Sequence, residues 1–513
     1  MRGTKRSWAL VGGIVLVLSA CSNGGGTNNQ SSGGGGFGTT LRTAFSEDVG
    51  SIDPDNNFEV QGLGMILGMY QGLVQYEPGS AKLTGLLASS WKVSSDSKTY
   101  TFTLRQGVKF HDGTPMTSQS VKDAFERRVQ HQDLFTGYFL GGVSSIDTPD
   151  PHTLVINLKS PDYSFLDGLA SPWGPKVIGP DAIKTHAGSD YSKAWLAAHE
   201  DGTGPYQLTS YERGIEYSLK SFTSYWGPAA HFSEIDIKIV PDVGQQILQL
   251  QNGQIDFVDQ YPFTQLSQVP STLKTLSWNN DGMELAILNT HRLSDLSLRR
   301  AIAAAIDPSG WVPQAFGKFG SPAESNYSKT QLPPPTPWTW PTAGSSDSKS
   351  APAITIGYAT NDVELQGLVA NYLIADLQRI GLHATARAIP TDQFNSLPKH
   401  ASTGPDIALV HFYPDDMFPG SLSYLVYQCG TPLNYLDYCN NKADDLFNKA
   451  WGTADEAQRN TLFLDAAKVG FDDASFLGLA DIQDVIVYRP GLSNLETYPA
   501  LPWNFNYGLA TAS

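Results

Sequence analysis

The clearest pattern of apolar and polar positions in the chain spans residues 87–129. Trp91 and Val93 alternate with polar residues, the polar run from Ser94 to Lys98 turns the chain, and apolar residues alternate again from Tyr100 to Leu104. Two alternating runs joined by a polar turn predict a β-hairpin.

An amphipathic helix is predicted directly after this hairpin. Thr117 can cap its first turn, because a threonine oxygen accepts a hydrogen bond from a free backbone N–H there. Val121, Ala124, Phe125 and Val129 recur at helical spacing and make one apolar stripe. The pattern fixes local structure here and does not name a function.

Alternating strand and helix patterns continue along the chain and predict an α/β fold. We expect a helix over residues 243–252 to turn Ile247, Leu248 and Leu250 toward the core. The strands that flank it are expected at 235–239 and, returning, at 255–258. Later elements are expected as strands at 285–288, 354–358 and 485–488 and as helices at 298–306, 365–380, 443–451 and 455–469.

The amino terminus has the pattern of an export signal. Three basic residues precede a short apolar run, which suits a signal peptide over residues 1–20 better than a spanning helix. Leu18 to Cys21 looks like a lipobox, and the alternative is an ordinary secretory signal cleaved near Ala20. Residues 21–39 are mostly Gly, Ser, Asn and Thr, a composition typical of a flexible tether.

Length and charge describe a large acidic protein. A chain of 513 residues is too long for one ordinary core, and 41% hydrophobic residues can pack more than one. The formal charge is −16, and removal of three basic residues with the signal leaves 50 acidic against 31 basic side chains, or −19. This argues against nucleic acid as a partner and weakly favours cationic or zwitterionic ligands.

The hairpin and helix together carry a longer signature. Leu87 to Arg128, LASSWKVSSDSKTYTFTLRQGVKFHDGTPMTSQSVKDAFERR, closely resembles that of the family 5 extracellular solute-binding proteins, the peptide, nickel and oligosaccharide receptors of bacterial ABC importers. A signature of about forty positions is more specific than a short motif. Other segments similar to the family's motifs are Gly202–Tyr206, Tyr225–Gly227, Leu250–Asp256 and Leu298–Asp307.

The resemblance implies an α/β fold of the two-lobed class II periplasmic-binding-protein type, with an extra inserted subdomain. We expect lobe I to comprise residues 40–277 plus 484–513, with the inserted subdomain at about 62–201, and lobe II to span 278–483. The lobes would close on a ligand in the cleft between them. We expect the ligand to be a peptide.

The resemblance also implies a location and partners. Cleavage before Cys21 and lipid on its thiol would anchor the protein to the membrane, at the cell surface or in the periplasm. The cargo would pass to ABC permease subunits in that membrane. We expect a monomer with no cofactor and no nucleic-acid partner.

Cys429 and Cys439 remain once Cys21 carries lipid. In an oxidising compartment we expect them to form a disulfide, which would stabilise the fold by about 3 kcal/mol in the chain-entropy model. A zinc site needs more ligands than two cysteines, and no histidine lies at a suitable spacing.

The strongest candidate for ligand chemistry is the segment His411 to Phe418, HFYPDDMF, after the strand predicted at 407–410. Open α/β sheets place ligands beyond the carboxyl ends of their strands. In the peptide receptors that the chain resembles, the matching Tyr-Pro-Asp-Pro lines the cleft and gives an aspartate to the ligand's ammonium group. Asp415 holds that position, and Asp416 replaces the second proline. Capping of the next turn is the alternative role for Asp415.

Aromatic residues and a loop of the first lobe supply the other candidates. Rings can stack on a ligand, although they also form cores, so packing is the alternative for each ring. By resemblance, the loop after Ile52 faces the cleft from the first lobe. The candidate contacts are Tyr413, Phe412, Tyr427, Phe58, Glu59 and Trp311.

Enzyme and metal motifs are missing from the sequence. There is no G-x-S-x-G, no H-E-x-x-H and no phosphate loop, so we expect a binding protein and no enzyme. The ten histidines are scattered, which gives no metal site built by the protein alone, although His411 could complete the shell of a chelated metal. The alternatives are a receptor for an oligosaccharide or a nickel chelate in the same fold, and a secreted hydrolase or surface sensor.

Overall fold

The structure is a computed structural model, and it describes residues 37–513 except 58, 132, 135 and 342–352. The predicted signal peptide and most of the tether, with Cys21, lie outside the described residues. Phe37–Ser513 form one compact unit. No helix in the described part of the chain has both the length and the apolar character needed to cross a bilayer.

The hairpin and helix predicted from residues 87–129 are confirmed. Two strands pair antiparallel, and Thr117 caps the following helix by accepting a hydrogen bond from the backbone N–H of Ser120. Two further strands complete a sheet of order β4-β5-β7-β6. These elements are β4 (Ala88–Val93), β5 (Thr99–Leu104), α2 (Ser118–Gln130), β6 (Val143–Asp150) and β7 (Thr153–Leu158).

A second four-stranded sheet joins the start of the described chain to residues near 235. Its order is β1-β10-β9-β8, and β1 runs parallel to β10 although about 190 residues separate them. The strands are β1 (Thr40–Phe45), β8 (Tyr206–Glu212), β9 (Glu216–Ser221) and β10 (Glu234–Ile239).

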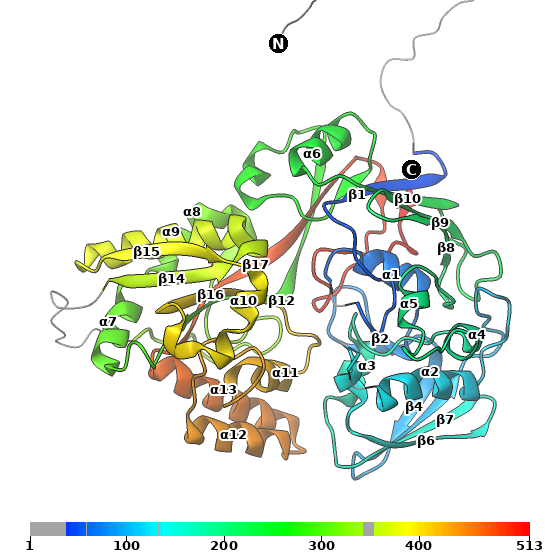
Figure 1. Cartoon of the computed structure of the whole chain (residues 1–513), viewed down its shortest axis with the longest axis horizontal. Coiled ribbons are helices and arrows are strands. Elements are labelled where there is room, and N and C mark those ends of the chain that lie inside the picture. The colour runs from blue at the N-terminus through cyan, green and yellow to red at the C-terminus, as the bar shows by residue number, and fades with distance from the viewer. Residues whose placement is uncertain (1–36, 58, 132, 135, 342–352) are drawn as a thin grey trace, which may run out of the picture. The chain divides into compact units, whose positions relative to one another are not determined.

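The largest sheet has seven strands and contains the two longest of the described chain (Figure 1). Its order is β11-β17-β12-β16-β14-β15, with β13 beside β17. One end of β12 pairs with β16, whereas the C-terminal end of β17 pairs with β11. The strands are β11 (Phe257–Val258), β12 (Lys274–Leu288), β13 (Gly320–Pro322), β14 (Ile354–Ala359), β15 (Ala384–Ile389), β16 (Ile407–Phe412) and β17 (Phe476–Tyr488).

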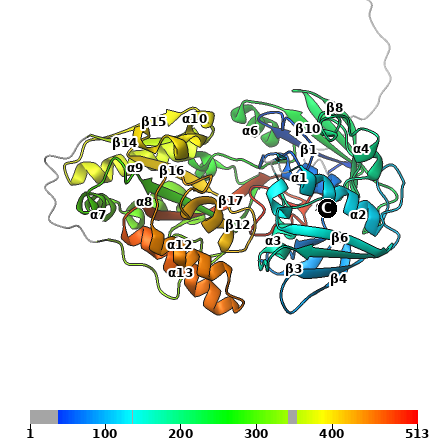
Figure 2. The same cartoon turned by 60° about the horizontal axis from the view of Figure 1, so that its bottom comes forward.

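Helices and short strands cover these sheets. Figure 2 shows α12 and α13 side by side, and α2 beside β6. The remaining elements are α1 (Leu63–Met69), β2 (Val74–Tyr76), β3 (Leu83–Gly85), α3 (Phe165–Ala170), α4 (Pro180–Lys184), α5 (Lys193–Leu196), α6 (Val243–Gln251), α7 (Leu296–Ala305), α8 (Pro308–Phe316), α9 (Val363–Arg379), α10 (Thr391–Asn395), α11 (Gly420–Leu422), α12 (Asn441–Trp451), α13 (Glu456–Asp472), β18 (Leu492–Ser493) and β19 (Thr511–Ala512).

The buried hydrophobic residues fall into two sets that meet at β12 and β17. The first set, in one large cluster and two small ones, draws on residues 41–273 and 486–510, and Met417 joins it from the other side. The second set, in two clusters, draws on residues 283–482. We call these sets the first and second cores. The lobe limits expected from the sequence follow a similar division and stay a prediction.

One local expectation around α6 is confirmed and one is wrong. The returning strand expected at 255–258 is present as β11, which pairs with β17 and lies outside the sheet of β10, because periodicity in the sequence does not tell which sheet a strand joins. Leu248 is 48% exposed, whereas Ile247 and Leu250 are buried three positions apart on one face of the helix.

Candidate ligand-binding site

The segment after β16 makes hydrogen bonds to residues in the part of the chain that builds the first core. The side chain of Asp415, a residue only 4% exposed, accepts a hydrogen bond from the Tyr138 hydroxyl. The Asp415 carbonyl accepts one from Ser171 Oγ at 2.5 Å. The backbone N–H of Met417 donates to the Tyr76 hydroxyl at 3.0 Å. Three bonds therefore join this segment to residues more than 240 positions earlier.

Asp416 holds the local turn. Its carboxylate accepts hydrogen bonds from the backbone N–H of Phe418 at 2.9 Å and from Ser421 Oγ at 2.5 Å. This is the pattern of an aspartate that stabilises a turn. Asp415 directs its carboxylate to Tyr138 instead, so the two neighbouring acids have different partners.

A cavity of 620 Å³ lies where these residues meet. It is large enough for a small organic ligand. Its lining comes from residues 138–168, in the part of the chain that builds the first core, and from residues 415–451, in the part that builds the second. Among the lining residues are Tyr138, Phe165, Asp415, Asp416, Tyr424 and Trp451. The predicted acidic pair is therefore at a cavity wall, and its contact with ligand stays a prediction.

A second cavity, of 450 Å³, also has walls from both sides of the molecule. Glu59, a predicted ligand contact, lines it together with Glu47, Glu364 and Trp503. Burial, followed by the charge of Glu47, raises the pKa of Glu59. Phe58, the neighbouring candidate, lies outside the described residues.

Tyr413 belongs to a buried hydrogen-bond network that ends on Asp484. Its hydroxyl donates to Asp484 at 3.3 Å, and Asn280 Nδ2 donates to the same carboxylate at 2.5 Å. The backbone N–H of Trp503 donates to the other oxygen at 2.8 Å, and its ring lies 5.1 Å from that of Tyr413. Gly282 is required beside Tyr413, because a Cβ there would lie 2.4 Å from the tyrosine ring.

Burial perturbs the acids of this region strongly. Desolvation raises the pKa of Asp415 to about 6 and that of Asp484 to about 7. Burial also raises the pKa of Asp281 well above its usual range, and the charges of Asp416, Asp484 and Asp415 add to this. Asp281 and Asp484 were not found from the sequence, because no motif surrounds either residue and the strands predicted there begin only at residues 285 and 485.

Three aromatic candidates lie in the second core. Phe412 and Tyr427 are 6% and 3% exposed in one cluster, and the Tyr427 hydroxyl donates to the carbonyl of Asn326. Trp311 is 3% exposed in the other cluster and stacks on Tyr372 at 5.4 Å. The structure thus gives all three a packing role, and their contact with ligand remains a prediction that the geometry does not favour.

His411 is a buried imidazole on β16 opposite Glu284 of β12. Its side chain is 2% exposed, and its Nδ1 lies 3.3 Å from the Glu284 carboxylate. Burial lowers the pKa of His411 to about 3, so the ring is neutral at physiological pH. Gln366 Nε2 also donates to Glu284, at 3.1 Å.

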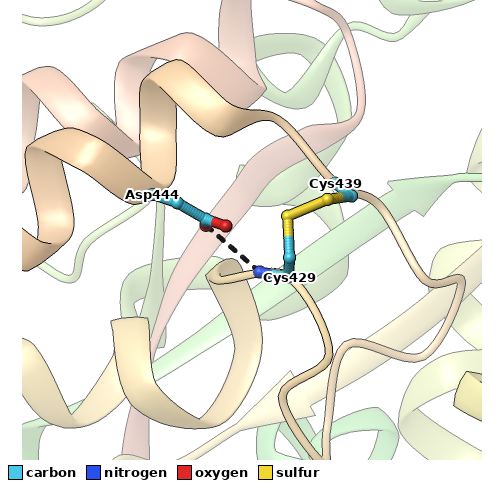
Figure 3. A group of neighbouring side chains, drawn as sticks. All are labelled: Cys429, Cys439 and Asp444. Carbon is cyan, nitrogen blue, oxygen red and sulfur yellow. Dashed lines mark hydrogen bonds between the residues drawn. A yellow bond between two sulfur atoms is a disulfide. The ribbon is translucent and has the colours of Figure 1, made fainter.

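The disulfide expected between Cys429 and Cys439 is present. Figure 3 shows Asp444 beside it, with the carboxylate accepting a hydrogen bond from the backbone N–H of Cys429 at 3.2 Å. These three residues are close enough to suggest metal ligands, but the two sulfur atoms are bonded to each other and offer no thiolate. The disulfide instead closes a loop from Cys429 to Cys439, of which Cys429 and Thr431 line the 620 Å³ cavity.

Comparisons with known proteins identify the family of the chain. The family model described as "Bacterial extracellular solute-binding proteins, family 5 Middle" matches residues 82–434. The probable D,D-dipeptide-binding periplasmic protein DdpA of Escherichia coli K12 is 29% identical over 90% of this chain and 92% of its own length. The glutathione-binding protein GsiB of the same strain is 24% identical over 90% of this chain and 93% of its own. These relatives are named as binding proteins and not as enzymes.

Solved structures share the fold. A dipeptide-binding protein from Pseudoalteromonas sp. SM9913, in complex with Met-Leu, has a TM-score of 0.78 at 19% identity and covers 92% of this chain and all of its own. NikA from Brucella suis, in complex with Fe(III)-EDTA, has a TM-score of 0.79 at 21% identity with the same coverage. The expected class II periplasmic-binding-protein fold is therefore confirmed. The chain belongs to the family 5 bacterial extracellular solute-binding proteins of ABC importers.

Proposed function

We propose that this protein captures short peptides with a free amino terminus and delivers them intact to an ABC permease. The observation that supports this most is the buried carboxylate of Asp415 at the wall of a cavity large enough for a small peptide. A peptide ammonium that meets a buried carboxylate gains a charge-assisted hydrogen bond. The relative named for D,D-dipeptides and the solved complex with Met-Leu point to the same class of cargo.

The cargo is held between two lobes that move about a hinge. The lobes have the limits expected from the sequence, and β12 and β17, which carry both cores, form the hinge. The bonds from Tyr138 and Ser171 to Asp415 close the lobes around the cavity. A ligand that contacts both lobes binds the closed form more tightly than the open form, and this difference in affinity shifts the equilibrium toward the closed form.

The protein works outside the cytoplasm as a monomer. Periplasmic and extracellular relatives support this location, and the lipobox supports an anchor through lipid on Cys21. The chain transfers its cargo to the permease without chemical change, which fits relatives named as binding proteins.

A thermal-shift screen of the full chain tests this function. The ligands are a pool of di- to tetrapeptides, a pool of oligosaccharides and nickel(II) chelates. A peptide that binds the native state raises the melting temperature by mass action. If sugars raise it and peptides do not, the peptide assignment fails and the receptor class stands.

A metal chelate is the second candidate cargo, because of His411. Its Nε2 is buried and has no hydrogen-bond partner among the described residues, and a neutral imidazole nitrogen is a good ligand for nickel. Nickel(II) with L-histidine should then raise the melting temperature of the native chain and not that of His411→Ala. No shift in the native chain would remove this candidate.

A further inference from the structure

Four carboxylates are buried together where β12, β17 and the end of β16 meet. Asp281 and Asp484 are each 1% exposed, and Asp415 and Asp416 are 4% and 5% exposed. Asp281 lies in the irregular stretch of β12 between Asn279 and Met283, where the strand breaks its register with β17. A bulge of this kind re-aims a side chain away from the regular ladder.

These acids have no cation beside them. Within the described ranges none of the four forms an ion pair with a lysine, arginine or histidine. The buried bases of the neighbourhood have other partners: Lys176 Nζ donates to the carbonyls of Ser171 and Gly174, and Arg459 donates to those of Thr453 and Ala454.

Asp281 stands apart from the other three acids in its hydrogen bonding. Asp415, Asp416 and Asp484 each accept at least one hydrogen bond from a side chain or backbone donor. The Oδ2 atom of Asp281 is buried and has no partner among the residues that the structure describes. A buried polar atom left without a partner costs free energy comparable to a lost hydrogen bond, and more when it is charged.

Two cavities lined by residues of both cores repeat this charge pattern, whereas a third, of 730 Å³, is lined by Lys274 and Lys318 and by no acid. Asp162, Asp415 and Asp416 line the 620 Å³ cavity, and Glu47, Glu59 and Glu364 line the 450 Å³ cavity. Neither set of described lining residues contains a lysine or an arginine. A ligand's carboxylate would therefore meet acids there and no basic partner, while a ligand's ammonium group would be favoured.

We propose that the cargo carries net positive charge and that Asp281 is a second carboxylate, beside Asp415, that pairs with it. This inference rests on the proposed function and names the charge class of the cargo. Burial of unpaired carboxylates is costly, and either protons or a cation from solution removes that cost. Burial raises the pKa of Asp281 well above its usual range, so a proton on this carboxyl reduces the cost in the empty protein and a bound cation would displace it.

The test compares peptides that differ only in charge, by isothermal titration calorimetry on the full chain at pH 7.5. The probes are alanyl-alanine, its C-terminal amide and its N-acetyl derivative, with net charges of about 0, +1 and −1 from the ordinary pKa values of the termini. We expect the peptide amide to bind at least about tenfold more tightly than the free-acid peptide. Both are attracted to the protein's carboxylates through their ammonium group, but only the free-acid peptide has a C-terminal carboxylate that those side chains repel. Equal or tighter binding of the free acid would overturn the inference.

Asp281→Asn isolates the new residue, with Asp445→Asn on the exposed face of α12 as the matched change of charge. We expect the ratio of the affinities for the peptide amide and the free-acid peptide to fall by about threefold or more in Asp281→Asn. The ratio should be unchanged in Asp445→Asn. An unchanged ratio in Asp281→Asn would contradict the role of Asp281. If the variant does not fold, titration of the native chain in two buffers of different ionisation enthalpy replaces it, and amide binding without proton release contradicts the proposal.

The binding measurements distinguish a wrong charge class of the cargo from a wrong assignment of the protein as a peptide receptor. If the free-acid peptide binds best, the protein is a peptide receptor and its cargo is not required to be cationic. If no peptide binds and 1,5-diaminopentane does, the peptide assignment falls and the cationic cargo stands.

Discussion

The Tyr138 hydroxyl donates a hydrogen bond to the Asp415 carboxylate across 277 positions of sequence. Tyr138 lies in a short helical turn, Gly137–Leu140, near the first core, and Asp415 follows β16 at the edge of the second. The bond has two consequences in the proposed mechanism: it helps to hold the lobes closed, and it orients the carboxylate toward the cargo.

Removal of this hydroxyl should weaken binding more than folding. We expect Tyr138→Phe to lower peptide affinity by about three- to tenfold, since one hydrogen bond to a charged group contributes about 1.5–3 kcal/mol and solvent replaces part of it. Tyr138 is 36% exposed, so the melting temperature should change little. Calorimetry measures the affinity, and Tyr191→Phe, at a 40% exposed tyrosine that lines neither the 620 Å³ nor the 450 Å³ cavity, is the control. Equal losses in both variants would remove the closing role of Tyr138.

Asp415 should recognise the amino terminus of the cargo. Asp415→Asn is expected to weaken a free-amino peptide by about tenfold or more, because it leaves a buried ammonium without its charged partner. An N-acetylated peptide should lose much less, and Asp445→Asn should affect neither. Titration of both peptides against the three proteins measures this, and a similar loss for both peptides in Asp415→Asn would contradict the anchor role.

Local structure could be predicted from the sequence wherever one periodic segment decided it. The hairpin, the cap at Thr117 and the helices near residues 443 and 455 follow from spacing and composition. The sheet that β11 joins could not be predicted in this way, because pairing over more than 200 residues leaves no local pattern. The resemblance supplied the overall fold.

The candidate site could be predicted only in part for the same reason. Asp415 follows a strand and matches a family motif, whereas Asp281 and Asp484 lie inside strands and come together only through the pairing of β12 with β17. Phe412, Tyr427 and Trp311 could not be separated from core residues, because an aromatic ring has the same pattern in a core and in a cleft.

Loss of the disulfide should lower stability and affect the cavity wall. Replacement of Cys429 and Cys439 by serine reopens a short loop, and we expect the free energy of unfolding to fall by about 2–4 kcal/mol. Denaturant titration measures this. Dithiothreitol should destabilise the native chain and leave the double variant unchanged, and an equal response of both to the reductant would contradict the assignment.

Stability of the empty protein should fall as pH rises through neutrality. Burial raises the pKa of Asp484 to about 7, whereas an unfolded aspartate titrates near about 3.9. The folded chain holds a proton that the unfolded chain has lost, so this contribution is fully present below about pH 4 and is lost as pH rises through 7. Burial lowers the pKa of His411 to about 3, so the folded chain keeps this ring neutral where the unfolded chain would protonate it. His411 therefore lowers the stability as pH falls, and it does so only below about pH 6.5.

Asp484→Asn should therefore reduce the decrease in melting temperature between pH 6.5 and 8. The carboxylates of Asp281 and Asp415 nearby titrate in both proteins, so the difference between the two curves reports Asp484. Parallel curves for the native chain and the variant over this range would show that Asp484 is not protonated in the folded state.

Native mass spectrometry of the full chain after incubation with a di- or tripeptide shows whether the protein captures a peptide and leaves it intact. We expect one intact peptide bound per chain, released unchanged on denaturation, with an adduct that is weaker in Asp415→Asn. A peptide recovered in pieces, or no peptide adduct at any concentration, would contradict the proposed function.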